Sequence, residues 1–106
     1  TPIAFAEVYL ALQQGTVDAQ ENPLPTIQAK KFHEVQTHIS LTGHITESLL
    51  TIIGSGTMRR LNEQERGIFR EVLAQAADRC TASIRAQEGE LPAWFRAQGK
   101  TVQDPD

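Results

Sequence analysis

The sequence predicts a mixed α/β fold that forms part of a larger domain. Helical and strand patterns alternate along the 106 residues, and one long amphipathic helix dominates the second half. Only three short strands precede that helix, which is too few to make a complete sheet. We therefore interpret residues 1–106 as a fragment of a single α/β protein.

The first helix is expected over Ala6–Gln14, where apolar residues recur at helical spacing. Gly15 ends it, because glycine adopts the left-handed conformation after a helix without strain. A short, partly β-branched strand is expected over Thr16–Gln20. Residues 22–25, Asn-Pro-Leu-Pro, then interrupt regular structure, since proline restricts the preceding residue to extended conformations. Glu21 and its neighbour therefore follow the carboxyl end of a strand, where open α/β sheets bind ligands.

The middle of the chain predicts a second helix and two further strands. The helix is expected from an N-cap at Thr26 to about Val35. His38–Thr42 alternates polar and apolar residues, which predicts a strand with one apolar face. Glu47–Ile53 is richer in Leu and Ile and predicts a more deeply buried strand, and residues 54–56, Gly-Ser-Gly, predict the turn that closes it.

The long helix is the clearest element. Asn62 and Glu65 form a capping pair, in which each side chain can bond the backbone amide of the other residue. Beyond them, apolar side chains recur at three- and four-residue steps and predict a buried stripe: Phe69, Val72, Leu73, Ala76, Cys80 and Ile84. The single cysteine lies on this stripe, so we expect it to serve as inert core packing.

Proline is expected to interrupt the long helix at Pro92. Trp94 and Phe95 predict another packed turn beyond it, which Gly99 ends. Thr101–Gln103 predicts a short strand, and residues 104–106 predict a loop.

Composition and charge exclude several classes of protein. The apolar fraction of 40% and the charged fraction of 22% are ordinary for a soluble globular protein. The net charge of −3 and the lack of clustered Lys and Arg argue against nucleic acid as a partner. The longest apolar run, Leu49–Ile53, is too short to span a bilayer, so no membrane insertion is expected.

No catalytic motif is present in the sequence. It contains no nucleophile elbow, no phosphate-binding loop and no paired carboxylates with a clear shared face. The lone cysteine, His33 and His38 have no companion ligands at metal-binding spacing. We therefore predict neither an enzyme, nor a cofactor, nor a metal site.

The stretch from Phe5 to Leu24 resembles, almost residue for residue, a segment of the solute-binding proteins of tripartite ATP-independent periplasmic (TRAP) transporters. Residues 31–36, Lys-Phe-His-Glu-Val-Gln, are similar to the family's Lys-Phe-Tyr-Glu-Val-Gln. Residues 40–44, Ser-Leu-Thr-Gly-His, stand where the family usually has Leu-Thr-Asn-His. The resemblance is specific in the first half of the chain and matches only in character after Gly54.

Proteins of this family fold as two α/β lobes joined by a hinge and close over an organic acid. The resemblance implies that this chain is a partial lobe of such a two-lobed, periplasmic-binding-protein-like fold. It also implies a periplasmic protein that captures a carboxylate, dicarboxylates included, and delivers it to TRAP membrane permease subunits. The region that carries the family's carboxylate-gripping arginine has no counterpart here. The identity of the acid, and whether a metal ion bridges it to the protein, stay open.

Four residues are candidate ligand contacts through the same resemblance. Asn22 corresponds to the asparagine that hydrogen-bonds the ligand carboxylate, and its amide can donate to an anion. Phe5 corresponds to an aromatic residue that packs against the apolar part of the ligand. Glu21 also matches, and we expect it to contact ligand hydroxyls or to position its neighbours. His44 matches the motif, although Gly43 replaces the asparagine that usually precedes it.

Other interpretations of these residues stay open. Asn-Pro commonly starts a turn, Phe5 can be a core residue near a helix start, and Glu21 and His44 can be solvated or structural. The chain could also belong to the ligand-sensing input domain of a signalling protein on the same scaffold, or be a small interaction protein unrelated to the family. Because unpaired strand edges invite association, the exposed edges of a fragment leave it open to self-association.

Overall fold

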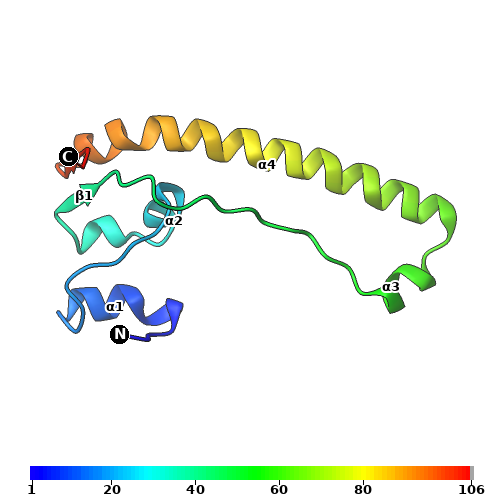
Figure 1. Ribbon diagram of the computed structural model, residues 1–106, viewed down its shortest axis with the longest axis horizontal. Helices are drawn as coiled ribbons and strands as arrows, with labels where there is room; N and C mark the ends of the chain where they lie inside the picture. Colours follow the sequence, from blue (N-terminus) through cyan, green and yellow to red (C-terminus); the bar gives the residue numbers. More distant parts are fainter. Residues whose placement is uncertain (106) are drawn as a thin grey trace. The chain divides into compact units, whose positions relative to one another are not determined.

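A computed structural model describes residues 1–105 of the chain, and Figure 1 shows its elements. The chain divides into two compact units. The split unit combines residues 1–45 with the stretch from Ala86 onward, and the central unit is Thr46–Arg85. In chain order, the elements are η1 (Phe5–Glu7), α1 (Val8–Gln13), α2 (Leu24–Ala29), η2 (Phe32–Glu34), β1 (His38–Ser40), α3 (Ser55–Arg60), α4 (Glu63–Ala97) and β2 (Thr101–Gln103), where η marks a 3₁₀ helix.

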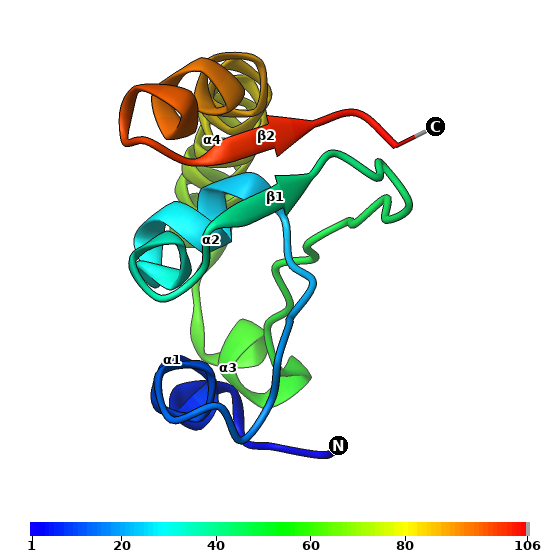
Figure 2. The ribbon, with the colours of Figure 1, turned by 90° about the vertical axis from the view of Figure 1, so that its left-hand side faces the viewer.

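The split unit is joined by a parallel pair of strands. β1 pairs with β2 so that Ile39 lies beside Val102, and Figure 2 shows the two strands side by side. Ladder bonds extend past the strands, from the Thr101 amide to the Thr37 carbonyl at 3.0 Å and from the Leu41 amide to a β2 carbonyl at 2.9 Å. Ile39 is buried between two exposed neighbours, as the predicted alternation requires. The strands predicted at His38–Thr42 and Thr101–Gln103 are therefore confirmed, the first over His38–Ser40.

The first helix ends as predicted at Gly15, whose φ is +70°. The Gly15 amide donates to the Leu12 carbonyl at 3.2 Å, and the Thr16 amide donates to the Ala11 carbonyl at 2.9 Å. These two bonds form a Schellman motif, which satisfies carbonyls that the helix leaves unpaired. The Val17 amide also donates to the Ala11 carbonyl, at 3.4 Å. The predicted strand over Thr16–Gln20 is wrong, because its first amides close the helix and no strand of the described residues pairs with it.

Two short helices, α2 and η2, replace the single helix predicted from Thr26 to Val35. Pro23 is the N-cap of α2 and Pro25 lies in its first turn, where the missing amide costs no helical bond. The helix ends at Ala29, because Lys31 takes a left-handed conformation with a φ of +59°. η2 then turns two side chains, Phe32 and His33, into the interior.

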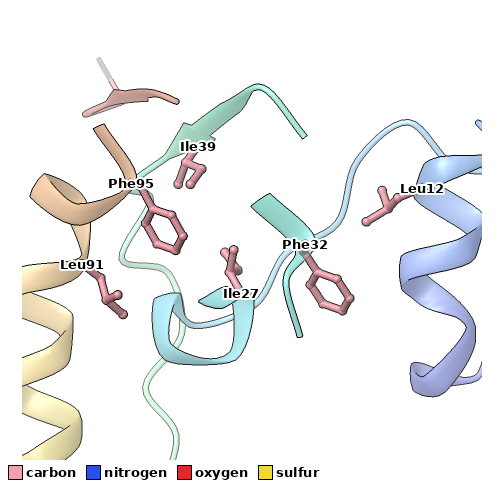
Figure 3. Packing of buried hydrophobic residues seen from close by; sticks show 6 residues of the cluster. All are labelled: Leu12, Ile27, Phe32, Ile39, Leu91 and Phe95. Atoms are coloured by element: carbon pink, nitrogen blue, oxygen red, sulfur yellow. The ribbon is translucent and has the colours of Figure 1, made fainter. Parts of the chain in front are cut away.

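The core of the split unit consists of apolar side chains from separate segments of the chain. Phe32 and Phe95 are almost fully buried, and they contribute the largest side chains to this cluster. Figure 3 shows the cluster, which comprises Leu12, Ile27, Phe32, Ile39, Leu91 and Phe95. Burying a side chain of this size stabilises the fold by about 1.5–3 kcal/mol relative to leaving it exposed.

The central unit contains α3 and the part of α4 up to Arg85. The predicted capping pair is present, because the Asn62 Oδ1 accepts from the Glu65 amide at 2.9 Å and the Glu65 Oε2 accepts from the Asn62 amide at 2.8 Å. The turn predicted at residues 54–56 is instead the start of α3, with Gly54 as its N-cap. Local hydrogen bonds therefore define the helix starts of this unit.

Two predictions of burial in the central unit are wrong. Residues 47–53 form no strand, and Leu49, Leu50 and Ile52 are 91%, 84% and 88% exposed. No strand of the described residues pairs with this segment, so its backbone gains no ladder. The stripe along α4 is likewise uncovered: Phe69, Val72, Ala76, Cys80 and Ile84 are exposed and Leu73 is half-buried. The helical period was correct, but Cys80 is an exposed thiol and not core packing.

α4 continues through Pro92 to Ala97, so the predicted interruption is also wrong. A proline inside a helix removes one backbone hydrogen bond and crowds the preceding turn, at a cost of about 3 kcal/mol. Leu91 and Phe95, four residues apart, are both buried on one face beside this proline. Their burial offsets the cost. The packing predicted for Trp94 and Phe95 is present, but inside α4 and not in a separate turn: Phe95 is fully buried, and the two rings meet edge to face at 5.2 Å.

Candidate functional site

A hollow of about 240 Å³ lies in the split unit, between the segment before α2 and the end of β1. Polar side chains form most of its rim, and buried apolar side chains form part of its wall. Its lining residues are Ala19, Gln20, Glu21, Asn22, Ile27, Phe32, His33, Gln36, His38, Ile39, Ser40, Thr42 and His44. The hollow thus brings together three of the four predicted ligand contacts.

Asn22 is half-buried at the rim of this hollow. Its Nδ2 donates to the Gln20 Oε1 at 2.6 Å, which holds the amide in one orientation. Pro23 follows with a φ of −57° and an extended ψ of 145°, and α2 begins immediately after it. An amide has two donor hydrogens and one acceptor oxygen, so Asn22 keeps one donor and its oxygen for another molecule.

Glu21 and His44 face each other across the hollow. The His44 Nε2 lies 3.2 Å from the Glu21 Oε2, and the His44 Nδ1 is hydrogen-bonded to the Thr42 hydroxyl. Because a carboxylate only accepts, the hydrogen of a neutral His44 ring lies on Nε2, and Thr42 then donates to Nδ1. Both side chains are more than half exposed, at 53% for His44 and 65% for Glu21, so water competes for the contact. The pair orients the two side chains more than it stabilises the fold.

Phe5 lies outside the lining of the hollow and is 47% exposed. Its ring meets the Phe32 ring edge to face, with centroids 6.0 Å apart and planes at 81°. The Lys30 ammonium lies 5.4 Å from the Phe5 ring centre, within range of a cation–π contact. Phe5 therefore contacts Phe32, which does line the hollow.

A hydrogen bond joins α1 to η2 beside this region. The Tyr9 hydroxyl donates to the Glu34 Oε2 at 3.0 Å, and the Lys31 ammonium lies 3.7 Å from the other oxygen of the same carboxylate. The hydrogen bond to Glu34 raises the pKa of Tyr9 above its ordinary value of 10.0, and burial and the carboxylate charge act in the same direction. The contact fixes the turn that carries Phe32 and His33.

The charges around the hollow limit what it can bind unaided. Its lining includes one carboxylate, Glu21, and no Lys or Arg. It offers neutral donors instead, including the Asn22 and Gln36 amides and the Ser40 hydroxyl. In the described part of the chain, no group of three His, Cys, Asp or Glu could hold a metal ion. The arrangement suits hydrogen bonding to a polar organic molecule.

Sequence reasoning missed several lining residues, notably Gln36, Ser40 and Thr42. The alternation over His38–Thr42 contained the signal, because its polar residues recur at every second position and all of them line the hollow. His33 was assigned no chemistry from its spacing, yet it is buried in the wall of the hollow.

A second, more open hollow of about 420 Å³ lies in the central unit. Arg59, Arg66 and Arg70 line it together with Ile53, Ser55 and Met58. The Arg66 Nε donates to the Met58 carbonyl at 2.9 Å, so one of the three guanidinium groups joins α4 to α3. None of the predicted site residues lies in this second hollow.

In residues 1–105, no helix is both long and apolar enough to cross a membrane.

Comparison with known proteins identifies relatives along the whole chain. Residues 1–106 match the family described as bacterial extracellular solute-binding protein, family 7. The chain is 42% identical over 106 residues to the sialic acid-binding periplasmic protein SiaP of Vibrio cholerae, covering 100% of this chain and 33% of that protein. It is 38% identical over 76 residues to the 2,3-diketo-L-gulonate-binding periplasmic protein YiaO of Escherichia coli, covering 72% and 22% respectively.

The fold is also similar to that of a solved structure. A TRAP periplasmic solute-binding protein of Roseobacter denitrificans, with bound 3-deoxy-D-manno-oct-2-ulosonic acid, superposes with a TM-score of 0.88 at 34% identity. The match covers 100% of this chain and 35% of that one. The chain thus spans about a third of the length of the relatives that it matches end to end.

Proposed function

Because the chain belongs to the TRAP solute-binding family, we propose that it contributes to a periplasmic protein that captures an organic acid and delivers it to membrane permease subunits. The observation that carries this proposal is the hollow in which Asn22, Glu21 and His44 converge. The family resemblance predicted these three residues as ligand contacts, and all three line the same hollow. The protein acts by binding, without chemical change of its ligand.

Asn22 is proposed to donate its free amide hydrogen to the ligand carboxylate. Gln20 already holds the other hydrogen of the same amide, at 2.6 Å, so the donor is oriented before the ligand arrives. A fixed donor loses less entropy on binding than a mobile one. Glu21 and His44 orient each other across the hollow, and Phe5 supports the apolar wall through its contact with Phe32.

The carboxylate charge needs a partner beyond this hollow, since no Lys or Arg of the described lining faces it. A cation supplied by another part of the protein would reach the ligand when the binding cleft closes. Contacts that exist only in the closed state shift the equilibrium towards it, which is how a ligand drives hinge closure. Closure then presents the loaded protein to the permease.

The named relatives support a narrower ligand class within the organic acids. Their names refer to sialic acid and 2,3-diketo-L-gulonate, and the solved structure holds 3-deoxy-D-manno-oct-2-ulosonic acid. All three are sugar acids, which combine a carboxylate with several hydroxyl groups. The hollow offers amides, hydroxyls and a carboxylate that suit such a molecule. We therefore propose a sugar acid as the ligand.

The test is calorimetric titration of the full-length protein with a panel of sugar acids and simple dicarboxylates. Asn22→Ala should weaken binding of the preferred acid by about tenfold to a hundredfold, because a hydrogen bond to a charged group contributes about 1.5–3 kcal/mol. Gln64→Ala, at an exposed position of α4, is the matched control and should bind like the wild type. A wild type that binds none of the acids would overturn the proposal. Binding that ignores Asn22→Ala would remove only Asn22 from the site.

A further inference from the structure

His33 is a buried polar side chain with an unpaired nitrogen. The residue is 8% exposed, and its Nδ1 is enclosed without a hydrogen-bond partner among the described residues. Buried polar atoms in folded proteins are paired in the great majority of cases. An unpaired one in the wall of a binding hollow therefore calls for a functional explanation.

Aromatic rings hold the His33 imidazole in its place. The Trp94 ring meets it edge to face with centroids 5.1 Å apart, and the Phe95 ring lies 5.4 Å away at 57°. A contact between the imidazole nitrogen and an aromatic ring is weaker than a hydrogen bond to a polar group. The two rings therefore do not replace a hydrogen-bond partner. Nearby Glu34 is already engaged by Tyr9 and Lys31. The ring is thus packed between aromatic side chains, and its Nδ1 has no partner among residues 1–105.

The same imidazole lines the hollow that holds Asn22. A half-turn about the bond from Cβ to the ring exchanges Nδ1 with Cδ2 and keeps the ring between its aromatic neighbours. An Nδ1 without hydrogen is an acceptor, and the ring that carries it lines the hollow. This position is also the one at which the chain has histidine where the family's Lys-Phe-Tyr-Glu-Val-Gln has tyrosine.

We propose that His33 determines ligand specificity, by accepting a hydrogen bond from a hydroxyl group of the bound sugar acid. The inference rests on the proposed function and deepens it, because it assigns one wall of the hollow to the polyol part of the ligand. A site that pairs a buried polar atom with a ligand hydroxyl discriminates against the analogue that lacks it, since the atom is then left unpaired. Asn22 accordingly binds the carboxylate of the ligand, and His33 binds one of its hydroxyl groups.

The experiment measures discrimination between ligands in the full-length protein. Sialic acid and 3-deoxy-D-manno-oct-2-ulosonic acid are titrated calorimetrically, together with analogues of the preferred acid that each lack one hydroxyl. His33→Phe keeps an aromatic ring between Trp94 and Phe95 and removes both nitrogens. It should weaken binding of the preferred acid by about fivefold to tenfold and leave one deoxy analogue unaffected, so that the wild-type preference for that hydroxyl disappears.

Gln64→Ala is the control, because Gln64 is exposed on α4 and does not line the hollow. Its preference for hydroxylated over deoxy ligands should equal that of the wild type. His33→Asn offers a polar atom near the position of Nδ1 and should retain part of the preference, which also covers the case in which His33→Phe does not fold.

Three outcomes separate the two proposals. Loss of preference for a single hydroxyl in His33→Phe supports the role of His33. Equal weakening of every ligand, deoxy analogues included, would show a packing role and overturn it while the proposed function stands. A wild type that binds no sugar acid would overturn the proposed function and this inference together.

Discussion

The two units of this chain treat their apolar residues in opposite ways. In the split unit, seven apolar side chains are buried, and they come from segments on both sides of the central unit. In the central unit, residues 46–85, no apolar side chain is buried, and seven large ones are exposed: Leu49, Leu50, Ile52, Ile68, Phe69, Val72 and Ile84. Similar apolar patterns in the sequence are therefore buried in one unit and exposed in the other.

The difference lies in what each unit uses to define its structure. The split unit is joined by contacts between residues far apart in sequence, such as β1 with β2 and Tyr9 with Glu34. The central unit is defined by contacts between near neighbours, such as Asn62 with Glu65 and Arg66 with Met58. An apolar stripe shows which face of a helix can be buried, and burial itself requires a second surface.

The largest expected difference between the units comes from truncating a phenylalanine in each. Phe95→Ala should lower the free energy of unfolding by about 3–5 kcal/mol, because the ring is fully buried and its loss leaves a cavity. Phe69→Ala should lower it by about 1 kcal/mol or less, because that ring is 43% exposed. Urea unfolding of the full-length protein measures both. Equal costs would show that a surface beyond the described residues covers Phe69, and the contrast between the units would fail.

A smaller effect with opposite signs is expected from two glycines. Gly15→Ala in the split unit should destabilise the protein by about 1 kcal/mol, because the position has a φ of +70° that alanine adopts only with strain. Gly67→Ala, inside α4, should stabilise it by about 0.5–1 kcal/mol, since alanine has the higher helix propensity. A Cβ at either position meets no atom within 4 Å, so neither change introduces a clash. Thermal unfolding gives the sign, and a stabilising Gly15→Ala would contradict the left-handed helix end.

The smallest expected effect concerns the pH dependence of the Tyr9 contact. Folding raises the pKa of Tyr9, chiefly through its hydrogen bond to Glu34, so the folded state holds the phenol proton more tightly. Its contribution to stability is complete below pH 10 and is lost as the pH rises through the raised pKa. The stability difference between wild type and Tyr9→Phe should therefore shrink only above pH 10. Glu34→Gln removes the charge and should bring the Tyr9 titration back towards 10.0. A Tyr9 that ionises below 10.0 in the wild type would contradict this.

Local features of the fold could be predicted from the sequence. The stop at Gly15 and the Asn62 capping pair depend on neighbours within a few residues, and both are present. The strand predicted at Thr16–Gln20 failed because the Thr16 and Val17 amides bond back to the first helix. Glu47–Ile53 has a strand-like composition, but a strand also needs a partner with free backbone groups.

The candidate site could be predicted only in part, and mainly through resemblance. Asn22, Glu21 and His44 line one hollow, whereas Phe5 lies outside it and contacts Phe32. The unpaired state of the His33 nitrogen could not be predicted, because it arises when α4 brings two aromatic rings against a turn some sixty residues earlier in the chain. The spacing of residues in the sequence does not predict this long-range contact.

The parallel pairing of β1 with β2 also sets an order of events during folding. His38 pairs with Thr101, and closing a flexible loop of about 60 residues costs roughly 3–4 kcal/mol of chain entropy. Helix turns closed by near neighbours form within about a microsecond, so the strand pair forms late. During synthesis, Ile39 lacks its strand partner Val102 until residues 101–103 have been made. Until then, β1 is an open edge available to other chains.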